Sequence, residues 1–399
     1  MVMDAVSRMV FMNFTPKWEY LNTRGAASKP SPGPIRRMPG LDGLRALAIL
    51  AVVWHHAHPG YAGWPISHNG FLGVDVFFVL SGFLITSLLL HEQQTTGAIS
   101  LTQFYVRRSL RIFPLYYAVL ALLAAYFALG KPSAQGLAFL SELPWHLAYA
   151  SNWVGLESMM AVTWSLSTEE QFYLVWPPVL ALLGARSLWW LGAFLVLNQA
   201  VNFGALDEVL AALHLPYGSL SILQITCTPI LLGVLLAFAL HLTALTELRQ
   251  RLQRLPGLAL WGACGAALWL ANLPGDIRGW PRLGFHIAVM AVVALVVAQP
   301  THRIVRALEW RPLAYVGVVS YGVYLLHKFT LHVANRGLDA LAITSPEARF
   351  ALVLLGTVAL AAVSYHAFEA PLLRLKTRFQ PRRRAAAGSP GAAAASVAD

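Results

Sequence analysis

Long apolar runs recur along the chain, and short basic or Gly/Pro-rich segments separate them. A membrane-spanning helix needs about 20 mostly apolar residues, and runs of that length occur repeatedly here. The runs are continuous and rich in Leu, Ala and Val, whereas the strands of a membrane β-barrel alternate polar and apolar positions. The pattern therefore predicts an all-α, polytopic membrane bundle of about ten transmembrane helices. The predicted spans are 41–58, 71–91, 111–130, 166–184, 187–204, 219–241, 257–273, 282–299, 312–333 and 348–369.

Composition and charge support this class of protein. Of 399 residues, 57% are hydrophobic and 12% are charged, against roughly 25% charged residues in a soluble domain. The net charge of +11 does not indicate nucleic-acid binding, because the basic residues are scattered between apolar runs. Most of the 29 Lys and Arg residues lie in segments that are cytoplasmic if the chain starts inside. The positive-inside rule then predicts a multi-pass protein of the inner (plasma) membrane with both termini cytoplasmic.

Three regions follow from the distribution of these spans. Residues 38–370 hold every predicted span and form one transmembrane domain. Residues 1–37 lack the pattern of a secretory signal, which predicts a cytoplasmic N-terminal segment. Residues 371–399 are basic and then rich in Ala, Gly, Ser and Pro, which predicts a disordered cytoplasmic tail. The two cysteines, Cys227 and Cys264, lie in separate apolar runs and favour packing over a disulfide or metal framework.

Ionisable residues inside apolar runs are the first candidates for function, because a charged side chain in hydrocarbon costs several kcal/mol. The first span carries Arg45 near its inner end and His56 about 16 Å farther out. Asp75 lies near the outer end of the second span, where it would orient His56 or bond to amides of the preceding loop. His55, His56 and His58 also allow a metal cluster, yet the chain has no HExxH motif or cysteine partner. We expect no metal.

Two further groups of charged residues lie at span ends. Arg107 and Arg111 share one helical face at the inner mouth of the third span, with Arg108 beside them. Such guanidinium groups can bind phosphate, although anchoring at an anionic leaflet explains the charge equally well. Glu169 and Glu170 lie where the fourth span enters the membrane. Helix geometry turns only one of them toward the bundle, and the other can serve the helix terminus.

The ninth span adds Tyr321 and His327, with the histidine in its outer half. His56, Asp75, Glu170 and His327 then share one outer depth, whereas the arginines gather at the inner side. The layout predicts an outer acid–base group and a separate inner group that binds anions.

Five motifs occur in order along the chain: LDGLRALAILAVVWHH, GVDVFFVLSGFLIT, FYVRRSLRIFPLYY, TWSLSTEEQFYLVWP and SYGVYLLH. Together they resemble the acyltransferase-3 family of integral-membrane O-acyltransferases, from about residue 38 to about residue 370. The resemblance implies an enzyme that moves an acyl group, by default acetyl, from cytoplasmic acyl-CoA to a hydroxyl of an extracytoplasmic carbohydrate such as a cell-surface polysaccharide. Its partners are then acyl-CoA as co-substrate, the carbohydrate acceptor and the lipid bilayer, with no tightly bound cofactor and no nucleic acid.

Candidate roles follow from the resemblance together with the positions above. The catalytic candidates are His56, Glu170, Asp75 and Arg45. The CoA-binding candidates are Arg107, Arg108 and Arg111, and the substrate-binding candidates are Trp164, Ser165, Tyr321 and His327. The chain departs from the family pattern at Thr168, where valine is usual. Some members carry a fused extracytoplasmic esterase-like domain, and we expect none here.

The chemistry of such a transfer requires a base or a nucleophile. A sugar hydroxyl is a poor nucleophile, so an imidazole must take its proton as it attacks the thioester, or must itself carry the acyl group. His56 is predicted for either role, with Glu170 or Asp75 on its other nitrogen. The alternative function is a transporter or flippase for a glycan or lipid-linked sugar, which also buries ionisable residues. That alternative predicts inverted repeats and discontinuous helices, and the sequence shows neither.

Overall fold

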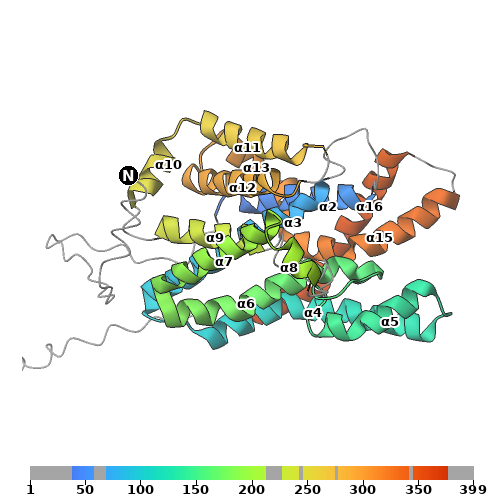
Figure 1. Ribbon diagram of the computed structural model, residues 1–399. Helices are drawn as coiled ribbons and strands as arrows, with labels where there is room; N and C mark the ends of the chain where they lie inside the picture. Colours follow the sequence, from blue (N-terminus) through green and yellow to red (C-terminus); the bar gives the residue numbers. More distant parts are fainter. Residues whose placement is uncertain are drawn as a thin grey trace, which may run out of the picture. The chain divides into compact units, whose positions relative to one another are not determined.

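The computed structural model describes residues 38–57, 69–212, 227–241, 246–274, 277–340 and 345–375. In this part of the chain the regular elements are all helical and no strand occurs (Figure 1). The all-α prediction is confirmed. His58, the predicted N-terminal segment and the predicted tail beyond residue 375 lie outside the described residues.

A helix overlaps each of the ten predicted spans. The helices are α2 (Leu41–Ala57), α3 (Gly73–Thr96), α4 (Leu101–Leu129), α5 (Ala134–Leu147), α6 (Trp164–Leu183), α7 (Ser187–Asn202), α8 (Asp207–Ala212), α9 (Cys227–His241), α10 (Thr246–Arg254), α11 (Leu258–Ala271), α12 (Trp280–Ala298), α13 (Arg303–Leu308), α14 (Arg311–Val318), α15 (Ser320–Ala340), α16 (Pro346–Ser364) and α17 (Ala370–Leu375). Short turns of 3-10 helix at Gly70–Leu72, Met159–Thr163 and Gly184–Arg186 precede α3, α6 and α7, and a π-helical turn at Tyr365–Glu369 follows α16.

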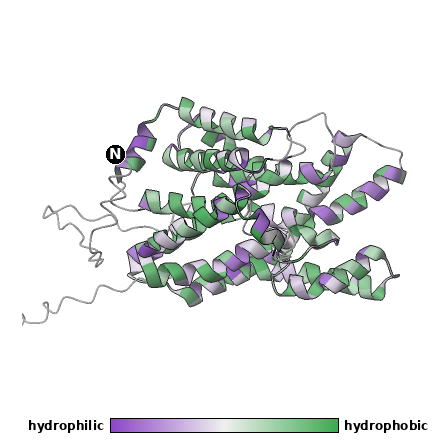
Figure 2. Ribbon diagram, viewed as in Figure 1, coloured by the Kyte–Doolittle hydropathy of each residue, from purple (hydrophilic) through white to green (hydrophobic). Residues whose placement is uncertain are grey.

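Five stretches in the described residues are long and apolar enough to cross a membrane: Gly70–Thr96, Leu101–Leu129, Met159–Asn202, Trp280–Ala298 and Pro346–Leu375. Within the longest of them, Gly184 has a φ of 52°, a left-handed conformation that glycine adopts without strain. The chain turns there, which divides the stretch into α6 and α7. Figure 2 shows that the helices are largely hydrophobic and that hydrophilic residues gather on α10, whose sequence is TELRQRLQR.

Helix α3 packs against α2, α6, α9 and α12. Its contact with α9 depends on reciprocal glycines. A Cβ on Gly82 of α3 would collide with the Ile230 carbonyl of α9, and a Cβ on Gly233 of α9 would collide with the Val79 carbonyl of α3. Small residues allow helix backbones in membranes to approach this closely. The glycines therefore let α3 lie deep among its neighbouring helices, and α3 carries Asp75 and Ser81.

We expect Gly82→Ala to lower the thermal unfolding midpoint of the detergent-solubilised protein. The added methyl group meets a backbone carbonyl that cannot turn away, and overpacking of this kind costs about 1–3 kcal/mol. The matched control is Gly192→Ala on α7, where a Cβ meets no atom within 4 Å and alanine has the better helix propensity. Equal midpoints for the two variants would show that the α3–α9 contact is looser than described.

Candidate active site

A cavity of about 90 Å³ lies among α2, α3, α4, α6 and α15. Cationic, acidic, hydroxyl-bearing and aromatic side chains all contribute to its wall. The lining residues are Arg45, Val74, Phe77, Phe78, Ser81, Arg108, Arg111, Ile112, Ser165, Leu166, Glu169, Tyr173, Ser320, Tyr321 and Tyr324. Five of the predicted site residues are among them: Arg45, Arg108, Arg111, Ser165 and Tyr321. A sixth, Trp164, packs edge-on against the lining residue Phe78, with ring centroids 6.2 Å apart.

Three arginines from two helices converge on this cavity. Arg45 comes from α2, and Arg108 and Arg111 lie one turn apart on α4. The Arg108 guanidinium stacks over the ring of Tyr173, 4.7 Å from its centroid. Guanidinium groups are suited to planar, bidentate binding of phosphate or carboxylate. Glu169, which was not among the predicted acid–base residues, lines the same cavity as the arginines.

Arg107 has a different environment from its neighbours. Its Nη2 lies 3.1 Å from Oε2 of the buried Glu92, at the end of α3. Oε1 of Glu92 accepts the backbone N–H of Ser100 at 2.9 Å. The Arg107–Glu92 ion pair therefore stabilises the turn between α3 and α4. The predicted pairing of Arg107 with Arg111 on one functional face is corrected: Arg108 and Arg111 share the cavity, and Arg107 does not line it.

The two adjacent glutamates also differ from expectation. Helix α6 begins at Trp164 and carries no acidic residue in its first turn, so neither glutamate serves the helix terminus. Ser165 and Glu169 are four residues apart and face the cavity together. Oε1 of Glu169 accepts a hydrogen bond from Ser81 Oγ at 2.5 Å. Glu169, and not Glu170, is the member of the pair that lines the cavity.

Glu170 faces a group of tyrosines. It is close enough to Tyr116, Tyr149 and Tyr321 to interact with them electrostatically. Its Oε1 is buried and has no hydrogen-bond partner among the described residues. The expectation that Glu170 orients His56 is corrected, because the hydrogen bonds of that imidazole go elsewhere.

His56 and His327 lie together, as their similar predicted depths require. Nδ1 of His56 is 3.3 Å from Nε2 of His327 and 2.9 Å from the Val52 carbonyl oxygen. Nδ1 of His327 lies 2.5 Å from the Tyr324 carbonyl oxygen, so it must be the protonated nitrogen of that ring. Nε2 of His327 is then an acceptor and Nδ1 of His56 a donor. This tautomer leaves Nε2 of His56 with a lone pair and no partner in the described part of the chain.

Tyr324 connects the histidine pair to the cavity. Its ring centroid lies 5.7 Å from that of His327, and the two histidine rings are 4.9 Å apart. The Tyr324 hydroxyl lies 2.6 Å from Ser165 Oγ. Tyr321, one turn earlier on α15, donates to the Ile112 carbonyl at 2.7 Å. The His56–His327 pair therefore lies next to the cavity wall, and Tyr324 is the residue that joins the two.

Asp75 belongs to a second buried cluster. Its Oδ2 lies 2.7 Å from Nη2 of Arg282 and 2.9 Å from Nε2 of His286, both on α12. The predicted interaction of Asp75 with His56 is wrong. Sequence reasoning missed Arg282 and His286, although two ionisable residues four positions apart in an apolar run are a readable signal.

Comparison with known proteins defines the family. Residues 38–366 match the acyltransferase domain family known as acyltransferase 3. The chain belongs to this family. Over 84% of its length it is 29% identical to the peptidoglycan O-acetyltransferase OatA of Listeria monocytogenes and 30% identical to the O-acetyltransferase OatA of Staphylococcus aureus. The chain spans 56% and 57% of the lengths of these two relatives. No solved structure matches it.

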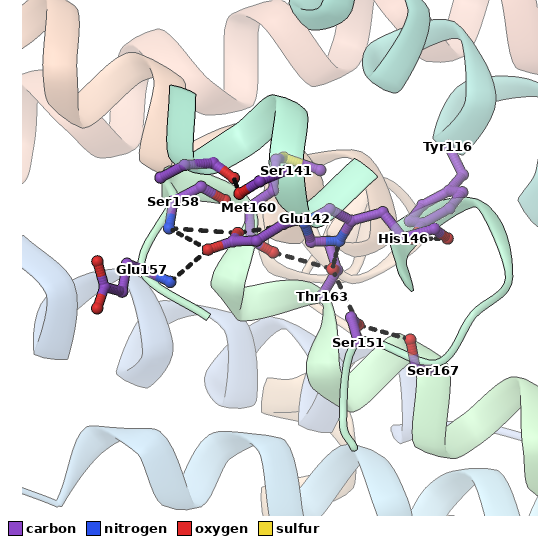
Figure 3. A network of polar contacts seen from close by, with 11 residues as sticks. Tyr116, Ser141, Glu142, His146, Ser151, Glu157, Ser158, Met160, Thr163 and Ser167 are labelled. Carbon is purple, nitrogen blue, oxygen red and sulfur yellow. Dashed lines mark hydrogen bonds and ion pairs between the residues drawn. The ribbon is translucent and has the colours of Figure 1, made fainter. Parts of the chain in front are cut away.

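In this acyltransferase-3 chain, the segment between α5 and α6 is fixed by a buried polar network (Figure 3). Oε1 of Glu142 accepts the backbone N–H of Glu157 at 2.7 Å, and Oε2 lies 3.6 Å from Nε2 of His146. Burial lowers the pKa of His146, although Glu142 opposes the shift. Further links run from His146 through Thr163 and Ser151 to Ser167 on α6. The network thus holds the first turns of α6, from which both glutamates project.

Proposed function

We propose that this protein is a membrane O-acetyltransferase that moves an acetyl group from cytoplasmic acetyl-CoA to a hydroxyl of an extracytoplasmic cell-wall polysaccharide. Its family membership and the O-acetyltransferase names of its relatives support the reaction and favour it over glycan transport. The observation that carries the proposal is the arginine-lined cavity beside an oriented histidine pair. Such a combination suits an anionic donor and an acceptor that must lose a proton.

The arginines suit the phosphate end of acetyl-CoA, and His56 suits its thioester end. Arg45, Arg108 and Arg111 would hold the phosphates of acetyl-CoA through charge-assisted hydrogen bonds. Arg45 and His56 are separated by about 16 Å along α2, a distance that the pantetheine arm of CoA can bridge. The thioester would then lie near the histidine pair.

His56 would act as the general base. Its Nε2 takes the proton of the acceptor hydroxyl while the oxygen attacks the thioester carbonyl carbon. The carbon–sulfur bond breaks, and the CoA sulfur leaves with the proton that His56 returns. During the step, the protonated imidazole is stabilised by donation from Nδ1 to the Val52 carbonyl and to His327. The acetyl ester and free CoA are the products.

The proposal includes ten crossings of the inner membrane with both termini cytoplasmic. Helices α9 and α11, at 15 and 14 residues, are shorter than the roughly 20 residues of an average span. Local thinning of the bilayer accommodates short helices at a modest cost. The distribution of Lys and Arg remains the main support for this topology.

Analysis of cell-envelope glycans tests the function. Mass spectrometry of glycans from cells with the protein should reveal O-acetyl esters that are missing from cells without it. Cells that carry the His56→Ala variant at equal membrane abundance are the control and should resemble the deletion. Identical acetylation in all three would contradict the proposed reaction.

Arg111→Ala should raise the KM for acetyl-CoA by about tenfold or more, since a hydrogen bond to a charged group contributes about 1.5–3 kcal/mol. The effect should weaken at high salt. Arg107→Ala is the matched control, and it should lower the unfolding midpoint instead, because it leaves Glu92 buried and unpaired. An unchanged KM in Arg111→Ala would remove the cavity arginines from donor binding.

A further inference from the structure

Two polar atoms next to the cavity are buried without a hydrogen-bond partner among the described residues. They are Oε1 of Glu170 and the hydroxyl of Tyr149. The two side chains are close enough to interact electrostatically. A buried polar group that forms no hydrogen bond is destabilising, so native structures retain few of them. Two such atoms in one place indicate a site for a ligand with a hydroxyl group.

The position of Tyr149 is secured by several contacts. Its φ of 50° is left-handed, a conformation that a bulky residue rarely adopts and that is found most often at functional sites. Gln171, the residue after Glu170, donates from Nε2 to the Tyr149 carbonyl at 2.8 Å. The ring stacks on Tyr116, with centroids 4.4 Å apart and an interplanar angle of 21°. Tyr116 in turn donates to the His146 carbonyl at 2.9 Å (Figure 3).

The pair also has a defined relation to the cavity, and the Tyr149 hydroxyl has a defined protonation. Tyr321, which lines the cavity, interacts electrostatically with both Tyr149 and Glu170. Burial raises the pKa of the Tyr149 hydroxyl, which therefore remains a donor at neutral pH. The site thus offers one donor and one acceptor beside aromatic rings.

We propose that Tyr149 and Glu170 bind a hydroxyl of the carbohydrate acceptor other than the one that is acetylated. The inference rests on the proposed function and adds an acceptor subsite to it. The Tyr149 O–H donates to the acceptor oxygen, and Glu170 Oε1 accepts the acceptor O–H. Tyr149 is then a binding residue for the acceptor, with no part in binding CoA.

Tyr149→Phe tests this subsite, with soluble peptidoglycan disaccharide as the acceptor probe. We expect the KM for the disaccharide to rise about tenfold, the loss of one hydrogen bond of about 1.4 kcal/mol. The KM for acetyl-CoA should not change. The unfolding midpoint should be equal or higher, because the variant removes a hydroxyl that has no partner. Glu170→Gln should raise the same KM. The control is Tyr126→Phe: Tyr126 is 64% exposed at the far end of α4, so its substitution should change neither KM nor the unfolding midpoint.

The outcomes separate this inference from the proposed function. If the unmodified protein acetylates the disaccharide and Tyr149→Phe leaves its KM unchanged, the subsite is wrong and the function stands. If the unmodified protein transfers no acetyl group, the proposed function fails. A lower unfolding midpoint in Tyr149→Phe overturns the subsite in either case, because it shows that the hydroxyl has a structural role.

Discussion

His56→Ala should lower the turnover number for acetyl transfer by about 10²–10⁴-fold, the usual contribution of a general base. The expected cause is the loss of the Nε2 lone pair of His56. The neighbouring His327 is fully buried, so it cannot take over as the base. Membrane abundance should remain near normal, because the half-buried imidazole adds little to helix packing. Turnover by the purified variant, at matched protein concentration, is the measurement.

His55→Ala is the control for that variant. His55 packs edge-on against Phe71, with ring centroids 5.6 Å apart, and forms no part of the cavity wall. Its removal should reduce turnover only slightly. A His56→Ala protein with near-normal turnover would remove His56 from the chemistry.

Asp75→Ala should destabilise the protein by about 3–5 kcal/mol, the cost of leaving a buried charge without its partner. Arg282 is 5% exposed and Asp75 is 1% exposed, so water cannot replace the lost carboxylate. Thermal unfolding in detergent and the yield of folded protein should both fall. The turnover number of the protein that remains folded should change far less than in His56→Ala.

A double variant, Asp75→Leu with Arg282→Met, provides the control. An apolar pair of similar volume often stabilises a buried site as well as an ion pair does. We expect it to recover only part of the lost stability, because the buried His286 loses both of its partners, Asp75 and Arg282. If Asp75→Ala instead has the unfolding midpoint of the unmodified protein but no turnover, Asp75 belongs to the catalytic machinery, as the sequence suggested.

Apolar periodicity was sufficient to predict the fold class and the positions of most helices. The first predicted span, 41–58, differs by one residue from Leu41–Ala57. The third span was predicted to begin at residue 111, whereas α4 begins at Leu101. Arg107 and Arg108 lie before the predicted start of the span because charge interrupts the apolar run, although the spacing of Arg107 and Arg111 already indicated one helical face. Helix extension past the membrane edge leaves no hydropathy signal.

Side-chain partners were harder to predict, because they depend on which helix faces which. His56 and His327 were predicted at one depth, and the two rings lie together. Depth alone also suggested that Asp75 pairs with His56, but rotation about the α3 axis turns the carboxylate toward α12. The two glutamates were assigned to different directions correctly, yet Glu169, which shares a helical face with Ser165, lines the cavity and Glu170 does not.

Reconstitution into sealed vesicles tests the central claim most directly. Labelled acetyl-CoA is placed on one side of the membrane and soluble peptidoglycan fragments on the other, with the purified protein or its His56→Ala variant in the bilayer. We predict that labelled O-acetyl ester accumulates on the fragments with the unmodified protein and not with the variant. Label that stays on the donor side, or equal ester formation by both proteins, would contradict transmembrane acetyl transfer through His56.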